Sequence, residues 1–361
     1  MSGTIERVDV DAASRPYEVL VGEGLLEQLG LLISELGHAG RCCVITETNV
    51  GPLYADIVES ALRSSGLETA PRVTFVAGES SKTLDTLGGI LEALAECALT
   101  RDDTIVALGG GVTGDMGGLA AALYLRGIRV VQVPTSLLAM VDSSVGGKTA
   151  VDLATGKNLV GAFWQPSLVV ADVNTLATVP PALFRDSCGE VIKHAVLADS
   201  ELLDELTIRP LTEEREPTRL AMVVAQNVAI KRNVVIADEC EMGLRQTLNL
   251  GHTIGHAIEA ASNFSLGHGS CVAAGLCMMA RASERRGWCS PETAARIIRC
   301  VNAHGLPTGT DLPAEELMRY AAHDKKRHGN RVNIVIPCEV GHCEVRCVSM
   351  SELRELIKLG L

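Results

Sequence analysis

The spacing of apolar residues alternates between two patterns through the first half of the chain. Short runs of consecutive apolar residues have the composition of buried strands. Each run is followed by a longer stretch with apolar residues three or four positions apart, which is the spacing of an amphipathic helix. This order predicts βαβ units around a parallel sheet. The predicted strands are residues 17–22, 41–48, 72–78, 103–111 and 129–136, and the predicted helices are 25–37, 53–66, 83–99 and 118–127.

The strand pattern fades from about residue 180 onward. Helical spacing dominates the rest of the chain, at residues 219–238, 253–261, 272–287 and 293–305, and only 332–338 and 343–349 read as short strands. The fold class we expect is therefore α/β, with a Rossmann-like domain at residues 1–180 and a mostly α-helical domain at residues 181–361. A chain of 361 residues is long enough for two hydrophobic cores.

Composition and charge narrow the range of functions. The net charge of −12 argues against a nucleic-acid surface, because phosphate binding needs a basic face. The first twenty residues lack a signal-peptide pattern, and no apolar run of about 18 residues suggests a membrane span. The twelve cysteines are scattered and form no CxxC pair, which favours reduced thiols. We expect a cytoplasmic protein with no membrane or nucleic-acid partner.

Two glycine-rich segments are candidates for anion binding. In DTIVALGGGVTGDMGG (residues 103–118) a strand runs into glycines and a helix start, a geometry that favours a phosphate but also occurs in a plain tight turn. Asp115 at this helix start has an equally simple interpretation as a charge that complements the helix dipole. The second segment, residues 141–158, carries Asp142, Lys148 and Lys157 among three glycines. It is too polar for a core strand, and anion recognition and a solvated loop explain it equally well.

Three histidines gather in NLGHTIGHAIEAASNFSLGHGS, residues 249–270. His252 and His256 are spaced i, i+4, which places two imidazoles on one helical face. A catalytic zinc site needs a third protein ligand. Glu259 lies in the same segment, whereas Glu190 lies in an apolar stretch with Lys193 three residues later. Taken in isolation, the spacing of Glu190 and Lys193 favours a surface ion pair. A buried carboxylate needs a cation, however, so Glu190 is a stronger candidate ligand than Glu259.

A polar stripe leads into the histidine segment. Arg245, Asn249, His252 and His256 follow one another at intervals of four, three and four. On one helix they form a single face, and such a face among leucines and glycines is suited to binding an oxyanion. Lys231, fourteen residues before Arg245, is expected on a neighbouring helix that lines the same cleft.

In this order, GGGVTGD, MVDSSVGGKTAVDLATGKNLVGAFWQP, EVIKHAVL, GLRQTLNLGHTIGHAIEA and LGHGS closely resemble the 3-dehydroquinate synthase family. The resemblance runs from about residue 17 to the DKK at 324–326. It implies an N-terminal NAD-binding α/β domain, a helical domain that carries a divalent metal (Zn²⁺, with Co²⁺ as the alternative), and a homodimer. It also implies the conversion of 3-deoxy-D-arabino-heptulosonate 7-phosphate, an anionic small molecule, into 3-dehydroquinate and phosphate.

The implied reaction combines transient oxidation by NAD, β-elimination of phosphate, re-reduction, ring opening and an intramolecular aldol closure, as a step of the shikimate pathway of aromatic amino acid biosynthesis. The resemblance makes Glu190, His252 and His268 the metal ligands and turns His256 to the substrate phosphate. The catalytic residues that it implies are Lys148, Glu190, Lys193, Lys231, Arg245, Asn249 and His256. The substrate-binding residues are Arg126, Asp142, Lys148, Asn158, Lys193, Lys231, Arg245, Asn249, His256, Lys325 and Lys326. The NAD-binding residues are Glu47, Asn49, Gly78, Glu79, Lys82, Gly110, Gly111, Val112, Asp115, Thr135, Ser136, Asp142, Lys148, Lys157, Thr175 and Thr178.

Three features depart from the family pattern. Ser270 and Cys271 follow the third histidine where HGEAV is common, Glu47 stands where an aspartate is usual, and Cys188–Gly189 precedes Glu190. The alternatives are a related cyclase that acts on sedoheptulose 7-phosphate, glucose 6-phosphate or an amino analogue of the substrate, and a metal-dependent polyol dehydrogenase. A third reading is an inactive protein that binds metal and nucleotide. Neither the 141–158 segment nor the Arg245–Asn249–His256 stripe is explained by a polyol dehydrogenase.

Overall fold

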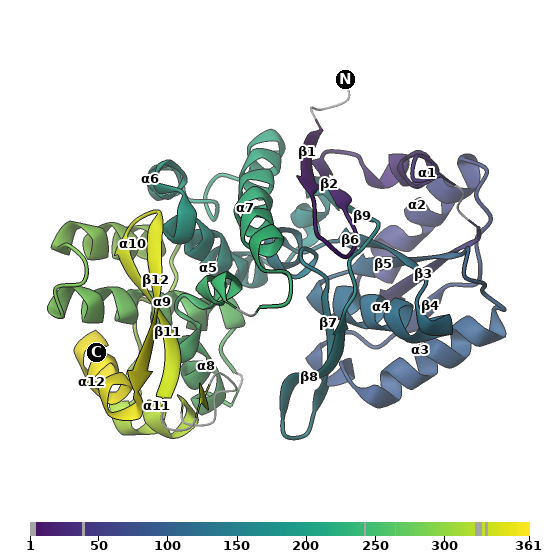
Figure 1. Ribbon diagram of the computed structural model, residues 1–361. Coiled ribbons are helices and arrows are strands. Elements are labelled where there is room, and N and C mark those ends of the chain that lie inside the picture. The colour runs from purple at the N-terminus through teal and green to yellow at the C-terminus, as the bar shows by residue number, and fades with distance from the viewer. Residues whose placement is uncertain (1–4, 38–39, 242, 264, 322–326, 329–330) are drawn as a thin grey trace. The chain divides into compact units, whose positions relative to one another are not determined.

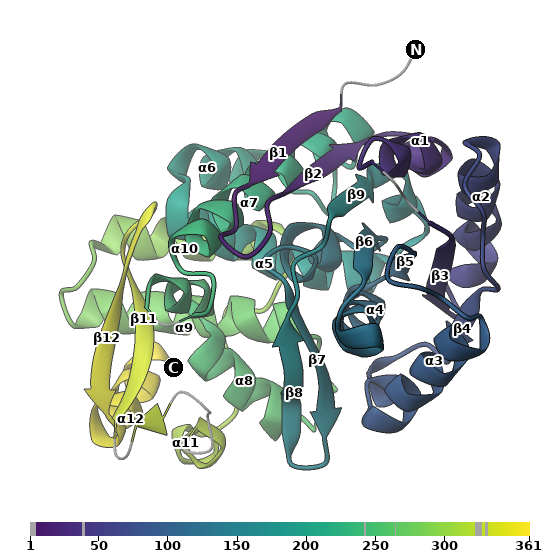
Figure 2. The ribbon, with the colours of Figure 1, turned by 45° about the vertical axis from the view of Figure 1, so that its right-hand side comes forward.

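The computed structural model describes residues 5–37, 40–241, 243–263, 265–321, 327–328 and 331–361. The chain forms two compact units (Figures 1 and 2). Unit 1 comprises Met1–Thr178 and Glu216–Glu239, and unit 2 comprises Val179–Arg215 and Cys240–Leu361. Each unit is formed by two separate stretches of the chain.

Unit 1 is built on a seven-stranded sheet with the order β1-β2-β9-β6-β5-β3-β4. The five predicted strands are all present, as β2, β3, β4, β5 and β6, and the pairs from β2 to β4 are parallel, as predicted. Two short strands, β1 and β9, were not predicted, and β1 pairs with β2 in antiparallel orientation. The bounds are β1 Glu6–Val10, β2 Tyr17–Gly22, β3 Cys42–Glu47, β4 Val73–Phe75, β5 Thr104–Gly109, β6 Arg129–Pro134 and β9 Leu168–Asp172.

Helices cover both faces of this sheet, and the alternation of side chains along β3 shows how. Cys42 and Val44 point into a core with α1 and α2, whereas Cys43 and Ile45 point into a second core with α3 and α4. The chain order of the strands reverses between β3 and β5, which is the position where doubly wound sheets bind ligands. The helices are α1 Leu29–Ser34, α2 Gly51–Ser64, α3 Leu84–Glu96 and α4 Gly111–Leu123.

The lysine- and glycine-rich segment 141–158 is neither a core strand nor a loop throughout. A π-helical turn, Ala139–Ser143, leads into a two-stranded antiparallel hairpin of β7 (Lys148–Leu153) and β8 (Gly156–Phe163). Most residues of β8 are exposed or half-buried, so its side chains do not need to be apolar. The polar composition of the segment therefore reflects an exposed hairpin, which the hydrophobic pattern does not reveal.

Helix α7 (Pro217–Ala237) belongs to unit 1, although the expected boundary at residue 180 placed it with the helical part. It packs against β1, β2 and the turn at Ala139–Ser143, so it covers an end of the sheet. Among the described residues, α7 is also the one helix that is long and apolar enough to cross a membrane by length and composition, with 61% of its apolar window buried inside the structure. Burial of an apolar helix against strands is typical of core packing.

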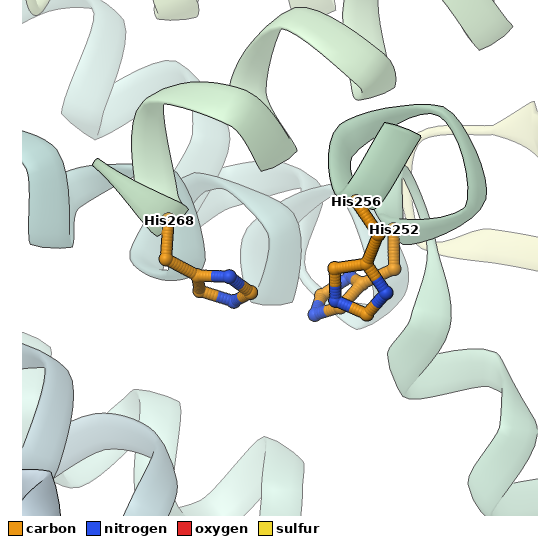
Figure 3. Close-up of side chains that lie close together, drawn as sticks. All are labelled: His252, His256 and His268. Carbon is orange, nitrogen blue, oxygen red and sulfur yellow. The ribbon is translucent and has the colours of Figure 1, made fainter. Parts of the chain in front are cut away.

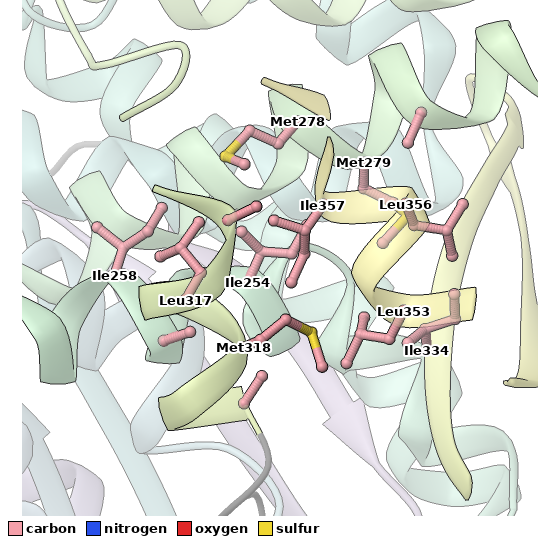
Figure 4. Close-up of a cluster of buried hydrophobic side chains, with 14 of the residues drawn as sticks. Ile254, Ile258, Met278, Met279, Leu317, Met318, Ile334, Leu353, Leu356 and Ile357 are labelled. Atoms are coloured by element: carbon pink, nitrogen blue, oxygen red, sulfur yellow. The ribbon is translucent and has the colours of Figure 1, made fainter. Parts of the chain in front are cut away.

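Unit 2 is mostly helical and surrounds a core shared by α8, α9, α11, α12 and β11 (Figure 4). The predicted strands 332–338 and 343–349 are confirmed as β11 and β12, which pair as a hairpin. Ser349 ends this hairpin and caps α12, because its side chain accepts the amide N–H of Glu352. The elements are α5 Pro181–Ala198, α6 Ser200–Ile208, α8 His252–Ala261, α9 His268–Arg285, α10 Pro291–Ala303, α11 Ala314–Ala321, β10 Arg327–His328, β11 Arg331–Glu339, β12 His342–Ser349 and α12 Met350–Gly360.

Candidate active site

The three histidines of the 249–270 segment come together in unit 2 (Figure 3). His252 is the first residue of α8, His256 lies one turn later, and His268 is the first residue of α9. The ring centroids are 5.2–5.7 Å apart. One ring nitrogen of each histidine lies within 4.8 Å of the others, a spacing that suits a shared metal ion.

Glu190 of α5 adds a carboxylate to this cluster. Its side chain is fully buried, and Oε1 lies 3.4 Å from Nε2 of His252 and 3.5 Å from Nε2 of His268. Among the described residues, Oε1 accepts no hydrogen bond of standard geometry. A buried carboxylate oxygen that faces two imidazole nitrogens is a costly arrangement without a cation. One carboxylate and two imidazoles are also a ligand set of catalytic zinc sites, so these residues fit a divalent metal.

Contacts at the far side of each ring orient the two imidazoles. Nδ1 of His252 lies 3.1 Å from the carbonyl oxygen of Leu250, and Nδ1 of His268 lies 3.2 Å from Oε2 of Glu259. Each contact directs Nε2 toward Glu190, as in metal sites where a carbonyl or carboxylate holds the ligating histidine. Glu259, which the sequence offered as a ligand, instead positions His268.

The carboxylate and two of the imidazoles in this cluster have strongly shifted pKa values. Burial raises the pKa of Glu190, but the Lys193 ammonium, together with His252 and His268, holds that pKa well below its usual range. Burial lowers the pKa of His252 well below its usual value. Burial also lowers the pKa of His268, but its contacts with Glu190 and Glu259 outweigh this and raise it to about 10. Glu190 is therefore ionised and His252 neutral, as metal ligands must be, while His268 holds a proton that a metal must displace.

Lys193 is a buried cation beside the cluster and not half of a surface pair. Its ammonium lies 2.5 Å from Oε2 of Glu190 and donates a hydrogen bond of 2.9 Å to the carbonyl oxygen of Leu248. The i, i+3 spacing on α5 therefore serves a buried ion pair that also joins α5 to the segment before α8.

Glycines let the three helices approach closely enough to assemble the cluster, a role that the hydrophobic pattern of the sequence does not reveal. A Cβ on Gly189 of α5 would lie 2.1 Å from the carbonyl oxygen of Gly269, and one on Gly275 of α9 would lie 2.2 Å from that of Gly251. These contacts place Glu190 next to His268 and α8 next to α9. The sequence does contain a sign of this close packing, because a glycine directly adjoins each of Glu190, His252 and His268 in the chain.

The polar stripe from Arg245 to His256 does not lie on one helix, and that expectation was wrong. Residues Leu244–Asn249 form a 3₁₀ turn, and the chain changes direction at Leu250 and Gly251 before α8 begins. Gly251 has a φ of +77°, which a side chain would strain. Arg245 is buried, at 1% exposed, whereas Asn249 is half-buried and its Nδ2 donates to Oε1 of Glu241 at 3.4 Å.

In unit 1, most of the residues expected to bind NAD follow the carboxyl ends of the parallel strands, which share one edge of the sheet. Glu47 ends β3, Gly78 and Glu79 follow β4, Gly110 and Gly111 follow β5, Thr135 and Ser136 follow β6, and Thr175 and Thr178 follow β9. A Cβ on Gly110 would meet only Ser136 Oγ, at 3.6 Å, so its backbone is accessible. A Cβ on Gly117 would lie 2.7 Å from Cβ of Ala107, so this glycine serves helix-to-strand packing.

Two polar networks join other expected residues of unit 1. The buried Lys82 ammonium lies 2.5 Å from Oδ2 of Asp115 and 2.5 Å from Oδ1 of Asn158. Burial raises the pKa of Asp115 to about 6, against the opposing effect of Lys82. Lys231 of α7 donates to Oδ1 of Asp142 at 2.6 Å and to its carbonyl oxygen. The simple helix-dipole interpretation of Asp115 therefore leaves out its ion pair.

Most of the remaining expected residues lie on other elements of unit 1. Lys157 lies 3.8 Å from Glu79, and Thr178 Oγ1 lies 2.7 Å from the hydroxyl of Tyr54. Lys148 is exposed at the start of β7, Asn49 lies two residues after the end of β3, and Val112 lies in the first turn of α4. Arg126 is exposed, with a left-handed φ of +66°. Lys325 and Lys326 lie outside the described residues.

Comparison with known proteins decides the family. Family models of the N-terminal and C-terminal parts of 3-dehydroquinate synthase match residues 72–186 and 187–327. The 3-dehydroquinate synthase of Symbiobacterium thermophilum is 43% identical over 334 residues, which cover 91% of this chain and 93% of that protein. The chain belongs to the 3-dehydroquinate synthase family.

Solved structures of related cyclases share the fold of this family member. A 2-deoxy-scyllo-inosose synthase complexed with carbaglucose-6-phosphate, NAD⁺ and Co²⁺ superimposes with a TM-score of 0.88 at 26% identity, covering 98% of this chain and 100% of that chain. The 2-epi-5-epi-valiolone synthase of Streptomyces hygroscopicus, with NAD⁺ and Zn²⁺ bound, gives 0.86 at 25% identity over 95% and 96% of the two chains. The α/β fold with a helical second part is confirmed.

The structure explains two departures from the 3-dehydroquinate synthase family pattern. The hydroxyl of Ser270 donates to Oδ1 of Asp186 at 2.7 Å, and the same carboxylate accepts the backbone N–H groups of Gly269 and Ser270. Asp186 thus caps the start of α9, where His268 lies. Glu47 accepts the backbone N–H groups of Asn49 and Val50, at 2.6 and 2.9 Å, so both its oxygens hold the start of α2.

Proposed function

We propose that the chain acts as a 3-dehydroquinate synthase, which converts 3-deoxy-D-arabino-heptulosonate 7-phosphate into 3-dehydroquinate and phosphate. The observation that carries the proposal is the convergence of Glu190, His252 and His268, with Lys193 buried beside them, in a chain of this family. The 43% identity to a curated 3-dehydroquinate synthase favours this activity over the related cyclases, whose matched structures are 25–26% identical.

Two cofactors belong to the proposal: NAD on unit 1, and a divalent metal, Zn²⁺ or Co²⁺, on unit 2. When bound, NAD supplies reversible hydride transfer at a carbinol carbon of the substrate, and the metal polarises the alcohol. Glu190, His252 and His268 would hold the metal. The residues after β3, β4, β5, β6 and β9 would hold NAD, with the open backbone at Gly110 available to the pyrophosphate.

The substrate is anionic, and the chain supplies cations and amide donors for it in both units. In unit 2, the exposed His256 lies next to the metal ligands and would bind the substrate phosphate, with Arg245 and Asn249 from the preceding turn. Lys193 would bind substrate oxygens beside Glu190. In unit 1, the expected partners are Arg126, Asp142, Lys148, Asn158 and Lys231, and beyond the described residues Lys325 and Lys326. These groups position the substrate and stabilise its negative charge, and none acts as a covalent nucleophile.

A single assay separates this function from the alternatives. With NAD and Zn²⁺ present, the protein should release phosphate from the heptulosonate phosphate and accumulate no NADH. Stoichiometric NADH would contradict the proposal and indicate a polyol dehydrogenase. Turnover of sedoheptulose 7-phosphate or glucose 6-phosphate without turnover of the heptulosonate would indicate another cyclase, and no turnover of any of these would indicate a protein that only binds its cofactors.

The quaternary structure and the location of the enzyme are also proposals. The family resemblance supports a homodimer, and the twelve scattered cysteines, which form no CxxC pair, support a cytoplasmic protein with reduced thiols. Sedimentation of the full chain at micromolar concentration tests the first proposal, with a mass of about 76 kDa expected, twice the 38.1 kDa chain. A sedimenting species of one chain mass would contradict it.

A further inference from the structure

A group of metal-ligating side chains outside the proposed active site lies at the closed end of the β11–β12 hairpin in unit 2 (Figure 1). Cys338 lies next to the last residue of β11, and His342 and Glu344 are the first and third residues of β12. One ligand atom of each side chain, namely a thiol sulfur, an imidazole nitrogen and a carboxylate oxygen, lies within 4.8 Å of the others. We call these three residues the hairpin cluster.

The backbone of the hairpin brings the three side chains together. The register of β11 against β12 shifts between Pro337 and Glu339, which leaves Cys338 as an extra residue in a β-bulge. A bulge redirects the side chain of its extra residue. On β12, His342 and Glu344 are two positions apart and therefore lie on the same face of the strand. The thiol and the two β12 side chains thus meet because of the bulge, which the hydrophobic pattern of the sequence does not reveal.

The two oxygens of Glu344 have different neighbours. Oε1 faces Nε2 of His342 at 3.9 Å, inside the hairpin cluster. Oε2 accepts hydrogen bonds from Nε and Nη2 of Arg346, at 3.3 and 3.0 Å. Arg346 therefore holds the carboxylate with Oε1 directed at the imidazole, in the way that outer hydrogen-bond partners orient the ligands of metal sites.

The ligand atoms of the hairpin cluster suit zinc better than calcium or magnesium. Zn²⁺ is bound by cysteine sulfur at about 2.3 Å and by histidine nitrogen or carboxylate oxygen at about 2.0–2.2 Å, whereas Ca²⁺ and Mg²⁺ take oxygen ligands. Tetrahedral ligands at these distances lie roughly 3.5 Å from one another. Atoms within 4.8 Å reach a common ion by small side-chain rotations, which the exposed positions of His342 and Glu344 allow. The thiolate and the carboxylate together neutralise the two charges of the ion.

We propose that the hairpin cluster binds a thiophilic divalent cation such as Zn²⁺, with water in the fourth tetrahedral position. Coordination releases the thiol proton of Cys338 to solvent. The site shares no ligand with the proposed catalytic metal site and does not rest on the proposed function. The turn of the hairpin is attached to α5, since the backbone N–H of Gly341 donates to the carbonyl oxygen of Val196 at 2.9 Å. A bound ion therefore stiffens a hairpin end that contacts the helix carrying Glu190.

Absorption of bound Co²⁺ separates this site from the proposed catalytic one. The hairpin cluster includes a thiol, so Co²⁺ bound there gives a thiolate-to-metal charge-transfer band in the near ultraviolet, whereas Co²⁺ on Glu190, His252 and His268 does not. The full chain, freed of metal and kept reduced with a phosphine, is titrated with Co²⁺ until its sites are filled. We expect a saturable band that corresponds to one cobalt ion per chain and that excess Zn²⁺ removes. Absence of the band at millimolar cobalt would overturn the proposal.

Variants of the hairpin cluster locate the ion. Cys338→Ser should lose the band. Glu344→Gln and His342→Ala should each weaken the cobalt binding that produces the band about tenfold or more, since even the outer contacts of a metal site contribute that much. Cys347→Ser, at an exposed cysteine of the same strand, is the matched control and should keep the band. Circular dichroism checks that each variant is folded.

Cys289 is a second thiol in this region that the experiment must separate from Cys338. It follows Trp288, and the guanidinium of Arg346 lies over the Trp288 ring at 4.6 Å from the centroid. Cys289→Ser should therefore be titrated beside Cys338→Ser and should keep the band. A band that survives in Cys338→Ser, or that is lost in Cys289→Ser or Cys347→Ser, would place the sulfur ligand elsewhere and would overturn the proposal.

Discussion

At the scale of single residues, the spacing of the histidines in residues 249–270 does not reveal which of them share a role. The i, i+4 pair His252 and His256 shares a face of α8, but the contacts separate their roles. His252 and His268 both direct Nε2 to the same oxygen of Glu190, and each is held at Nδ1. His256 lies beside them and is exposed, which suits contact with a ligand. The assignment of three ligands and one phosphate-binding histidine stays a prediction.

Substitution of each histidine tests that assignment. His268→Ala should lose the bound metal and with it activity, because a single imidazole and a carboxylate hold a divalent ion weakly. His256→Ala should retain metal and lose roughly a hundredfold or more in kcat/KM, as expected when a charge-stabilising group is removed. Metal content by atomic emission, in a Cys338→Ser chain that lacks the hairpin site, and phosphate release measure the two effects. His342→Ala, at an exposed histidine of β12, is the control. A metal-free His256→Ala protein would show that the i, i+4 pair binds the ion.

Metal binding should release protons, and the pKa values give the direction. Glu190 is already ionised and His252 already neutral, but the pKa of His268 is raised to about 10. Below that pH the metal must displace one proton, so affinity should rise about tenfold per pH unit between about pH 7 and 9. Calorimetry in buffers of different ionisation enthalpy counts the proton. Glu259→Gln removes one of the contacts that raise this pKa, so its affinity should level off at a lower pH. An affinity independent of pH would refute the protonated His268.

At the scale of elements, close helix contacts assemble the site. Glycines at the crossings of α5 with α9 and of α8 with α9 bring three helices within backbone contact. The predicted helices at 253–261 and 272–287 were correct, but their pattern contains no information on which partner each helix meets. How closely two helices approach depends on the residues of both helices, and here only the glycines at their contact reveal it.

Gly189→Ala tests this assembly. A Cβ at this position would lie 2.1 Å from the carbonyl oxygen of Gly269, so α5 and α9 must separate. We expect a loss of about 1–3 kcal/mol in the free energy of unfolding, because overpacking a buried contact forces backbone shifts. Metal affinity should fall as well, since Glu190 moves away from His268. Thermal denaturation and metal titration measure these effects.

Gly88→Ala on α3 is the matched control for this variant. No atom lies within 4 Å of the Cβ that it adds, so it should raise stability by about 0.4–1 kcal/mol. Equal stability and equal metal affinity in Gly189→Ala and the parent protein would show that the helices do not depend on this contact.

At the scale of the whole molecule, the expected cofactor residues are divided between two compact units. The metal cluster lies entirely in unit 2, and the strand ends and networks expected to contact NAD lie in unit 1. Helix α7 joins unit 1 although it follows α5 and α6 in the chain, so the boundary is not a single point in the sequence.

Because of this division, each cofactor should bind without the other. His268→Ala should bind NAD with unchanged affinity, whereas Lys82→Met, which leaves Asp115 unpaired in unit 1, should weaken NAD binding roughly tenfold and keep its metal. Equilibrium dialysis with NAD and metal analysis of both proteins provide the measurements. Loss of NAD binding in His268→Ala would show that the two sites depend on each other.

The sequence by itself determined the elements, the family and most of the chemistry. Period and composition identified the five parallel strands and the principal helices, because core burial imposes those patterns along a single segment. Motifs in order identified the residues that carry charge and those that we expect to bind metal. The π-helical turn and hairpin of residues 139–163 escaped this reading, since an exposed hairpin imposes little hydrophobic pattern.

The tertiary structure decided which residues meet. It placed Glu190 between two histidines more than sixty residues away in sequence and gave Glu259 a supporting position. It also divided the expected polar stripe between a 3₁₀ turn and the start of α8. It placed α7 in unit 1, where the helix packs against β1 and β2. These outcomes depend on contacts between distant segments. Local patterns encode the conformation of a segment and which of its faces is apolar, but not the neighbour against which that face packs.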